Sequence, residues 1–395
     1  MNSKNETLIF ISLLLIHIVS LILLIDNYSI SYNESVLYFS NDSLLSQLTH
    51  ISTSIIGQSN LGLRLPFILF YMGSVILLYL LLDNYFKGKW DRLITIAIFM
   101  LLPGINSAAM LVNSSIIVVF VTLLYLYSYK LFNKECYLLL ILMLFVDNSF
   151  AILFLALFFR SLQKKDNILL VVSLILFGIS MSMYGFVIDG RPKGFLLDTF
   201  GLYSSIFSPL IFLYYFYSIY RVGIKYDKDM FWYLSATSLG LSLIFSLRQH
   251  IALEDFAPFV VIGIPIMVKL FLHSMRIRLK SFRTLHHTIA SIGLSLLVIN
   301  FTIFTFNKYL YLVIPNPKSH FAYKYHIVTD LANQLKQRGI YEVTTNHKLQ
   351  TRLKFYGIKE GLKRTLTKVD NPLLKDTINI KYHNKVIVSY QINTI

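Results

Sequence analysis

The residues of this chain that could do chemistry lie between its apolar runs and not inside them. The longest polar stretch, residues 26–64, contains the carboxylate of Glu34. A carboxylate can take a proton from a hydroxyl group, and a cation can bind a phosphate group. Some polar stretches have no excess of Lys and Arg over Asp and Glu. Their few cations are Arg64, Arg191, Lys193 and Arg248. These stretches, and not the apolar runs, are the candidate places for a site.

The composition fixes the class of protein that must position these residues. Of the 395 residues, 55% are hydrophobic and only 14% are Asp, Glu, Lys or Arg, whereas a soluble domain carries about a quarter charged residues. The mean hydropathy of +0.62 excludes a soluble globule and a disordered chain. The single cysteine, Cys136, excludes a disulfide within the chain and a cysteine metal cluster. We therefore expect an all-α polytopic membrane protein.

Apolar runs predict about eleven transmembrane helices, because a crossing takes about 20 apolar residues. The run 136–159 has the length of one helix, but Asp147 interrupts it at its middle, and we expect a short hairpin there. The first run has no small-residue cleavage site after it, which indicates a retained anchor. The expected spans are 8–25, 66–82, 93–103, 115–129, 136–146, 149–159, 168–188, 199–220, 230–247, 257–272 and 287–306.

The positions of the cations predict the orientation of these spans. With the N-terminus inside, the inner segments hold 16 Lys and Arg and the outer loops before residue 307 hold 4. This is a strong positive-inside bias, so these cations set orientation and do not indicate nucleic acid as a partner. Of the net charge of +16, residues 307–395 carry +10, which orientation does not explain. An odd number of spans places the C-terminus outside. Because no chain of acids and bases crosses the bilayer, the pattern argues against a proton-coupled transporter or a channel.

The segment 307–395 differs in kind from the rest, with 15 Lys and Arg against 5 acids. A helical pattern over 328–335 is closed by Arg338-Gly339, and a short strand over 340–344 follows. Alternation over 377–382 and again over 386–390 predicts a hairpin. We expect a transmembrane domain over 1–306 and a small α/β domain over 307–395, outside the membrane.

Within the loop 26–64, apolar residues recur at helical spacing among Ser, Gln, Thr and His. This pattern predicts an amphipathic helix that lies in the membrane interface. Its apolar positions are Leu44, Leu45, Leu48, Ile51, Ile55 and Ile56.

The end of this loop, from Gly57 to Pro66, reads Gly-Gln-Ser-Asn-Leu-Gly-Leu-Arg-Leu-Pro. It resembles the first outer loop of the GT-C glycosyltransferases, and most closely the branch of dolichyl-phosphate-mannose protein mannosyltransferases and lipid A aminoarabinose transferases. Asn33-Glu34 with Tyr38 stands where that family has its Asp-Glu-x-x-Tyr-like motif. Further similar segments are Asn113-Ser114-Ser115, Arg248-Gln249-His250 with Glu254 and Pro258, and 353–357.

The resemblance implies a membrane glycosyltransferase with its site at the outer face. Because the chain shows no organellar signal, we expect it in a bacterial inner membrane. The donor would be a sugar on polyprenyl phosphate, and the acceptor a glycan, lipid or protein. Glu34 would be the catalytic base, and Asn33 would stand beside it in the catalytic motif. Arg248, Arg64, Arg191 and Lys193 would bind the donor phosphate, and Tyr38, Asn113, His250 and Glu254 the substrates.

Two departures from the family leave alternatives open. Asn33 and Asn113 stand where the family tends to have Asp, and Asn neither accepts a proton as a general base nor binds a divalent cation well. We therefore assign no metal ligand and no cofactor; a divalent cation is the one candidate, and Asn33 and Asn113 argue against it. Either Glu34 alone carries the base role, or Asp26 or Asp42 replaces it, or the chain is catalytically degenerate and binds or helps to handle lipid-linked glycans. A lipid-sugar flippase would need a polar path through the bilayer, which the sequence lacks.

Overall fold

The computed structural model describes residues 3–40, 43–185, 194–369, 371, 376–383 and 385–394. Contacts divide the chain into two compact units, each described here by itself. Unit 1 comprises 1–17, 69–109 and 113–301, and unit 2 comprises 18–68, 110–112 and 302–395. The domain boundary predicted after residue 306 lies close to the last of these divisions, but unit 2 also takes in the first long loop.

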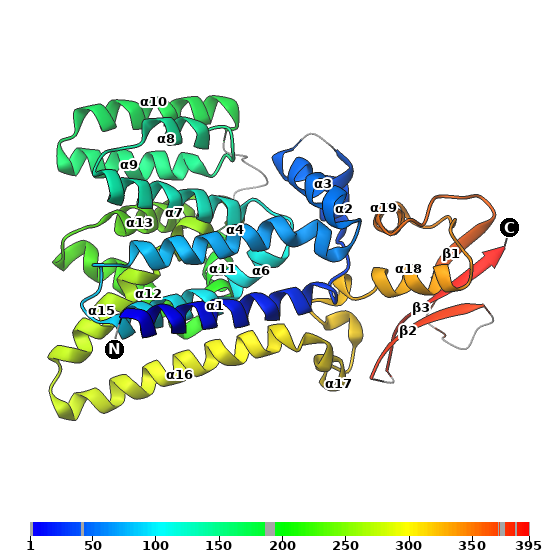
Figure 1. Cartoon of the computed structure of the whole chain (residues 1–395). Coiled ribbons are helices and arrows are strands. Elements are labelled where there is room, and N and C mark those ends of the chain that lie inside the picture. The colour runs from blue at the N-terminus through cyan, green and yellow to red at the C-terminus, as the bar shows by residue number, and fades with distance from the viewer. Residues whose placement is uncertain are drawn as a thin grey trace. The chain divides into compact units, whose positions relative to one another are not determined.

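Helices make up almost all of unit 1 (Figure 1). The helices that lie wholly or partly in it are α1 (Ser3–Ile25), α4 (Asn60–Leu81), α5 (Lys89–Leu101), α6 (Pro103–Met110), α7 (Ser115–Phe132), α8 (Tyr137–Met143), α9 (Phe150–Lys164), α10 (Asn167–Met183), α11 (Leu196–Phe207), α12 (Pro209–Lys225), α13 (Met230–Ser246), α14 (Leu253–Val261), α15 (Ile264–Ile277) and α16 (Lys280–Thr305).

Among the described residues, four helices are long and apolar enough to cross a membrane unaided: α1, α4, α7 and α16. Three further spans are possible if each of the bent pairs α5–α6, α11–α12 and α14–α15 counts as one crossing. The all-helical membrane architecture expected from the sequence is thus confirmed, while the number of eleven spans stays a prediction.

The prediction of one continuous helix over 199–220 is wrong. The chain breaks between α11 and α12, which meet at an angle of 107°. Ser208, at the break, has a φ of +79°. The following residue is Pro209, whose ring disfavours a helical conformation in the residue before it and which lacks an N–H for the helical ladder.

Small polar residues on α13 hold α14 against it. The Ser238 hydroxyl donates to the Phe256 carbonyl at 2.7 Å, and the Ser235 hydroxyl donates to the Phe259 carbonyl at 3.3 Å. Between α14 and α15, Gly263 lies so close to Ser235 that a Cβ atom there would collide with the serine side chain. Small side chains at helix contacts allow such close approach and satisfy carbonyls away from water. This packing fixes α14 against α13.

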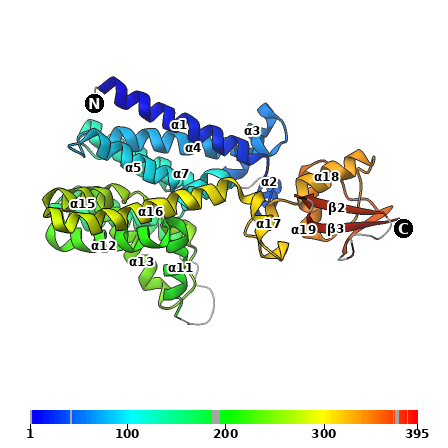
Figure 2. The same cartoon turned by 90° about the horizontal axis from the view of Figure 1, so that it is seen from below.

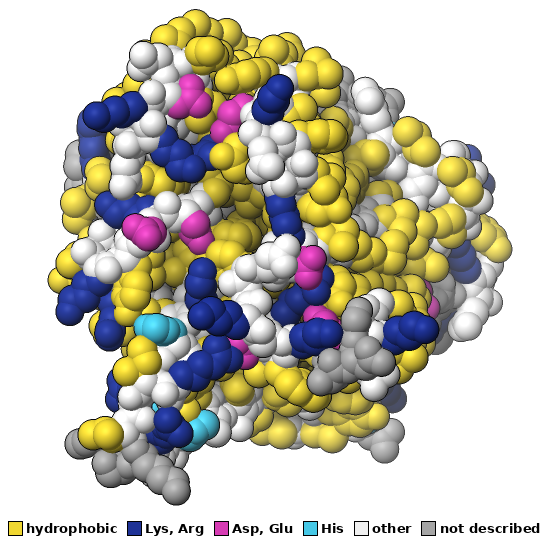
Figure 3. All heavy atoms as spheres, turned by 60° about the vertical axis from the view of Figure 1, so that its left-hand side comes forward, with side chains coloured by type: hydrophobic (Ala, Val, Ile, Leu, Met, Phe, Trp, Pro, Cys, Tyr) yellow, Lys and Arg dark blue, Asp and Glu magenta, His cyan; other side chains and the backbone are white. Residues whose placement is uncertain are grey.

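The segments that the charge count predicts to be inside come together at one end of unit 1. Arg92 forms ion pairs with Glu6 at 3.2 Å and Asp83 at 3.3 Å, and the Lys130 ammonium donates to the Leu80 carbonyl at 2.8 Å. In Figure 3, Lys and Arg side chains crowd the face that this end presents, and hydrophobic side chains cover the flanks. The clustering agrees with the predicted positive-inside arrangement, whose direction across a membrane stays a prediction.

In unit 2, the loop after α1 forms α2 (Tyr32–Ser40) and α3 (Leu44–Ile56). The amphipathic helix predicted from the sequence is α3, and Ser43 caps its N-terminus by accepting the Ser46 N–H. Its polar face is buried, through residues such as Thr49, while Ile51 and Ile55 are exposed. An outward apolar face suits a helix that lies in the membrane interface.

The remainder of unit 2 is the predicted small α/β domain, seen in Figure 2. Its three-stranded antiparallel sheet has the order β1-β3-β2, and the hairpin expected near its end is β2 and β3. The strand expected over 340–344 forms only isolated bridges, and β1 was not expected. The elements are α17 (Leu310–Val313), α18 (Val328–Gln337), α19 (His347–Phe355), β1 (Arg364–Val369), β2 (Thr377–Tyr382) and β3 (Lys385–Thr394), with short 3-10 turns at Asn307–Tyr309, Pro317–Ser319 and Tyr323–Tyr325.

Candidate functional site

Two of the residues that the sequence singles out in the first loop, Glu34 and Arg64, are bound to each other. Glu34 lies in the first turn of α2, and Arg64 lies in the first turns of α4. The Arg64 Nη2 atom is 3.0 Å from the Glu34 Oε2 atom, and Arg64 is 0% exposed. Arg64 also donates to the carbonyls of Tyr28 and Ser29. The guanidinium thus joins α2 to the segment that leads out of α1.

Glu34 has little capacity left for another hydrogen bond. Its Oε2 atom accepts the Ser31 N–H at 2.8 Å, and its Oε1 atom accepts the Val112 N–H at 3.1 Å, in addition to Arg64. Burial raises the pKa of Glu34, but the Arg64 charge and these hydrogen bonds outweigh it, so that the pKa lies below its ordinary value. The side chain is therefore an ionised, fully engaged carboxylate.

The Tyr356 hydroxyl is one of the groups that tie the same segment to the C-terminal domain of unit 2. The Tyr356 hydroxyl donates to the Asn60 Oδ1 atom at 2.6 Å and lies 3.0 Å from the Thr329 hydroxyl. It also accepts the Ile30 N–H at 2.9 Å. Residues distant in sequence thus meet at one atom, and this junction fixes the backbone just before Glu34.

We expect Tyr356→Phe to loosen this junction. The phenylalanine leaves the partly buried Ile30 N–H and Thr329 hydroxyl without this partner, at a cost of about 2 kcal/mol. Amide hydrogen exchange of the full chain in detergent should show faster exchange around Ile30. Tyr341→Phe, at an exposed tyrosine, is the matched control. Unchanged exchange at Ile30 in the Tyr356 variant would show that the junction carries no local stability.

Tyr38 and Asn33, both on α2, differ in their surroundings. The Tyr38 hydroxyl lies 3.2 Å from the Thr53 hydroxyl, and its ring packs on His50 with centroids 4.2 Å apart. Tyr38 thereby holds α3 against α2. Asn33 is exposed. The substrate and catalytic roles that the sequence predicts for these two residues stay predictions.

The other predicted site residues that the structure describes lie in unit 1. The Asn113 Oδ1 atom accepts the Ser115 N–H at 3.0 Å just before α7, and the Ser115 hydroxyl donates to the Glu254 carbonyl at 3.3 Å. Arg248 is exposed, with its side chain in no ion pair within the described part of the chain. Arg191 and Lys193 lie outside the described residues.

A small cavity adjoins this group at the N-terminal end of α14, and we refer to it as the α14 cavity. Its volume is about 100 Å³. It is lined by Asn148, Ser149, Ile152, Met181, Gly185, Phe245, Gln249, His250, Ile251, Ala252, Asp255 and Phe256. Among these residues, only His250 has a site role predicted from the sequence. The signal that could have found Asp255 is its position next to Glu254, directly before an apolar run.

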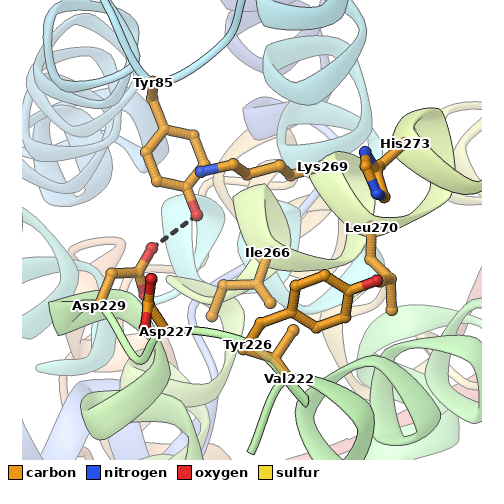
Figure 4. A pocket seen from close by; sticks show the side chains of 9 residues that line it. All are labelled: Tyr85, Val222, Tyr226, Asp227, Asp229, Ile266, Lys269, Leu270 and His273. Atoms are coloured by element: carbon orange, nitrogen blue, oxygen red, sulfur yellow. Dashed lines mark hydrogen bonds between the residues drawn. The ribbon is translucent and has the colours of Figure 1, made fainter.

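A larger pocket, of about 310 Å³, lies at the other end of the helices of unit 1 and holds none of the predicted site residues. The Tyr85 hydroxyl donates there to the Asp229 Oδ2 atom at 2.7 Å, and the Lys269 ammonium lies 4.0 Å from the centre of the Tyr85 ring (Figure 4). Because Asp229 also caps α13, this pocket is accounted for by helix packing. In the part of the chain that the structure describes, no group of three His, Cys, Asp or Glu side chains could hold a metal ion.

Comparison with known proteins gives a family match over part of the chain and a match in fold. Residues 44–147 match the family model described as dolichyl-phosphate-mannose-protein mannosyltransferase. No curated protein sequence matches the chain. Two crystal structures of ArnT from Cupriavidus metallidurans, one in the apo state and one bound to undecaprenyl phosphate, match with a TM-score of 0.55 and 11% identity. Each match covers 98% of this chain and 98% of ArnT.

These matches confirm the expected resemblance to GT-C glycosyltransferases. The chain is a helical integral membrane protein with the fold of ArnT over almost its whole length. The family match covers the predicted interfacial helix and the Arg64-Leu65-Pro66 segment, which carried the resemblance in the sequence.

Proposed function

We propose that this protein transfers a sugar from a polyprenyl-phosphate donor to an acceptor at the outer face of a bacterial inner membrane. The observation that carries the proposal is the match in fold with ArnT over the full length of both chains. One of the matching ArnT structures is bound to undecaprenyl phosphate. The partial match to a mannosyltransferase family supports the same class of donor.

The chemistry requires a cation for the phosphate and an acceptor for a proton. The acceptor hydroxyl attacks the anomeric carbon, and the polyprenyl phosphate leaves with the bonding electron pair, which inverts the anomeric centre. Arg248 is suited to the phosphate because it is exposed and in no ion pair with another described residue. Arg64 is buried against Glu34, and we propose that it positions the first loop.

A second function has a specific observation in its favour. Asn33 and Asn113 replace acids of the related motif, and the oxygens of Glu34 are already engaged. A chain without a usable carboxylate would bind lipid-linked glycans without transferring sugar. The two functions predict the same lipid ligand and differ only in turnover.

The test is a transfer assay with the purified full chain in detergent. The donors are labelled hexoses and pentoses on undecaprenyl phosphate, and an extract of bacterial envelope supplies the acceptors. We expect label in the acceptor fraction with at least one donor, and we expect Arg248→Ala to weaken binding of undecaprenyl phosphate at least tenfold. Binding without transfer from any donor would favour the second function, and absence of binding would remove both.

A further inference from the structure

The chain needs a carboxylate that can reach a substrate, and Glu34 lacks a free oxygen for one. The proton must go to a group whose lone pairs are open, within hydrogen-bond reach of the attacking hydroxyl. The exposed acids of the loops do not provide a confined place for that hydroxyl. The α14 cavity does, because it is small and is lined by a carboxylate.

Asp255 presents its carboxylate to this cavity. Its side chain accepts no hydrogen bond and forms no ion pair with any residue that the structure describes. Asp147 and Glu254 lie close enough to act on it electrostatically. The lining therefore offers acceptors for hydrogen-bond donors and repels anions.

A second observation concerns a polar group in the lining of the cavity that has no hydrogen-bond partner among the described residues. The Ser149 hydroxyl, which lines the cavity, is buried to 98% and makes no hydrogen bond with any described residue. A buried hydroxyl without a partner costs about 1–3 kcal/mol, so a ligand hydroxyl in the cavity would relieve this cost. The amides of Asn148 and Gln249 also border the cavity.

The size of the cavity suits one polar group of a substrate and not a whole sugar ring. A volume of about 100 Å³ holds roughly three water molecules at about 30 Å³ each. A hydroxyl on its carbon atom fits that space. Arg248 directly precedes Gln249 and His250, which line the cavity, so the proposed phosphate ligand stands next to it along the chain.

We propose, on the basis of the proposed function, that the α14 cavity receives the acceptor hydroxyl and that Asp255 is the catalytic base. The hydroxyl oxygen forms the bond to the anomeric carbon, and its proton goes to Asp255. The bond between that carbon and the phosphate oxygen breaks, and its electrons leave with the polyprenyl phosphate. Ser149 donates to the attacking group and holds it in place.

The test compares variants of the full chain in the transfer assay described above. We expect Asp255→Asn to lower kcat at least 100-fold, with the donor KM and the binding of undecaprenyl phosphate unchanged within twofold. Ser149→Ala should raise the acceptor KM severalfold without loss of thermal stability. Asp198→Asn, at an exposed aspartate in the first turn of α11, is the matched control and should leave kcat unchanged.

The outcomes distinguish a wrong assignment of the catalytic base from a wrong proposed function. Full transfer by Asp255→Asn, combined with loss of transfer in a folded Glu34→Gln variant, would return the base role to Glu34 and overturn this inference. A wild type that transfers from none of the donors would remove the proposed function itself. Because Ser149→Ala removes a hydroxyl that has no partner among the described residues, it reports on the cavity even if the Asp255 variant does not fold.

Discussion

Replacing Arg64 with alanine is expected to destabilise unit 2 by about 3–5 kcal/mol, which is the range for breaking a buried ion pair. Alanine would leave the Glu34 carboxylate buried without its counter-charge, because Arg64 is 0% exposed and Glu34 is 4% exposed. It would also release the carbonyls of Tyr28 and Ser29. The first loop would lose the connection between α2 and the end of α1.

Hydrogen exchange of the full chain in detergent measures this effect locally, over residues 26–40. Arg248→Ala is the matched control, because that arginine is exposed. We expect the Arg248 variant to keep native exchange and lose affinity for undecaprenyl phosphate, and the Arg64 variant to exchange faster. Loss of affinity in a stably folded Arg64→Ala protein would instead support the phosphate role that the sequence predicts for Arg64.

A double variant distinguishes the contribution of the two charges to stability from the contribution of side-chain packing. Glu34→Gln together with Arg64→Met removes both charges and keeps side chains of similar length. Replacing both partners of a buried pair by neutral groups is often close to neutral, whereas removing one partner is costly. We expect the double variant to recover at least half of the stability that Arg64→Ala loses. No recovery would show that the hydrogen bonds of Arg64 to the Tyr28 and Ser29 carbonyls, and not its charge, stabilise the loop.

Local pattern was enough to predict several elements of this fold. The apolar spacing from Leu44 to Ile56 predicts α3 because amphipathic periodicity is a property of consecutive residues. The closing glycine of α18, Gly339, has a φ of +69°, as expected for a helix end marked by Arg338-Gly339. The alternation in β2 and β3 likewise predicts a hairpin without knowledge of the rest of the chain.

The pairings between distant segments could not be predicted in this way. Each of Glu34 and Arg64 has a residue type that suits chemistry, and only the fold shows that they neutralise each other. The Val112 N–H reaches Glu34 from a segment 78 residues away. The α14 cavity draws on Ser149, Gly185 and Asp255, whose proximity depends on how three helices pack.

Lowering the pH from 7.5 to 4.5 is expected to destabilise the C-terminal domain of unit 2 through His326. Burial, reinforced by the charges of His320 and Lys308, lowers the pKa of His326 to about 3. Its Nδ1 atom lies 3.1 Å from the Tyr311 hydroxyl, and its ring also contacts Tyr28 and Tyr382. Asp330, which accepts a hydrogen bond from the Tyr382 hydroxyl, is the neighbouring acid.

The direction of the pH dependence follows from which state, folded or unfolded, binds a proton at His326 more readily. In the unfolded chain His326 takes up a proton below pH 6.5, whereas in the folded chain it stays neutral down to about pH 3. Stability is therefore complete above pH 6.5 and falls as the pH decreases, by about 1.4 kcal/mol for each pH unit well below 6.5. Burial also lowers the pKa of His320, which adds to the loss in the same direction.

His326→Phe should flatten this pH dependence while keeping the ring contacts. At pH 7.5 the variant is expected to be less stable than the wild type by about 1–2 kcal/mol, because the Tyr311 hydroxyl loses its partner. At pH 4.5 the difference should vanish or reverse, because the variant has no proton to take up on unfolding. Hydrogen exchange of residues 320–390 in the full chain, corrected for intrinsic rates at each pH, measures both. His347→Gln, at an exposed histidine of α19, should keep the wild-type slope, and a wild-type slope in His326→Phe would place the acid sensitivity at another group.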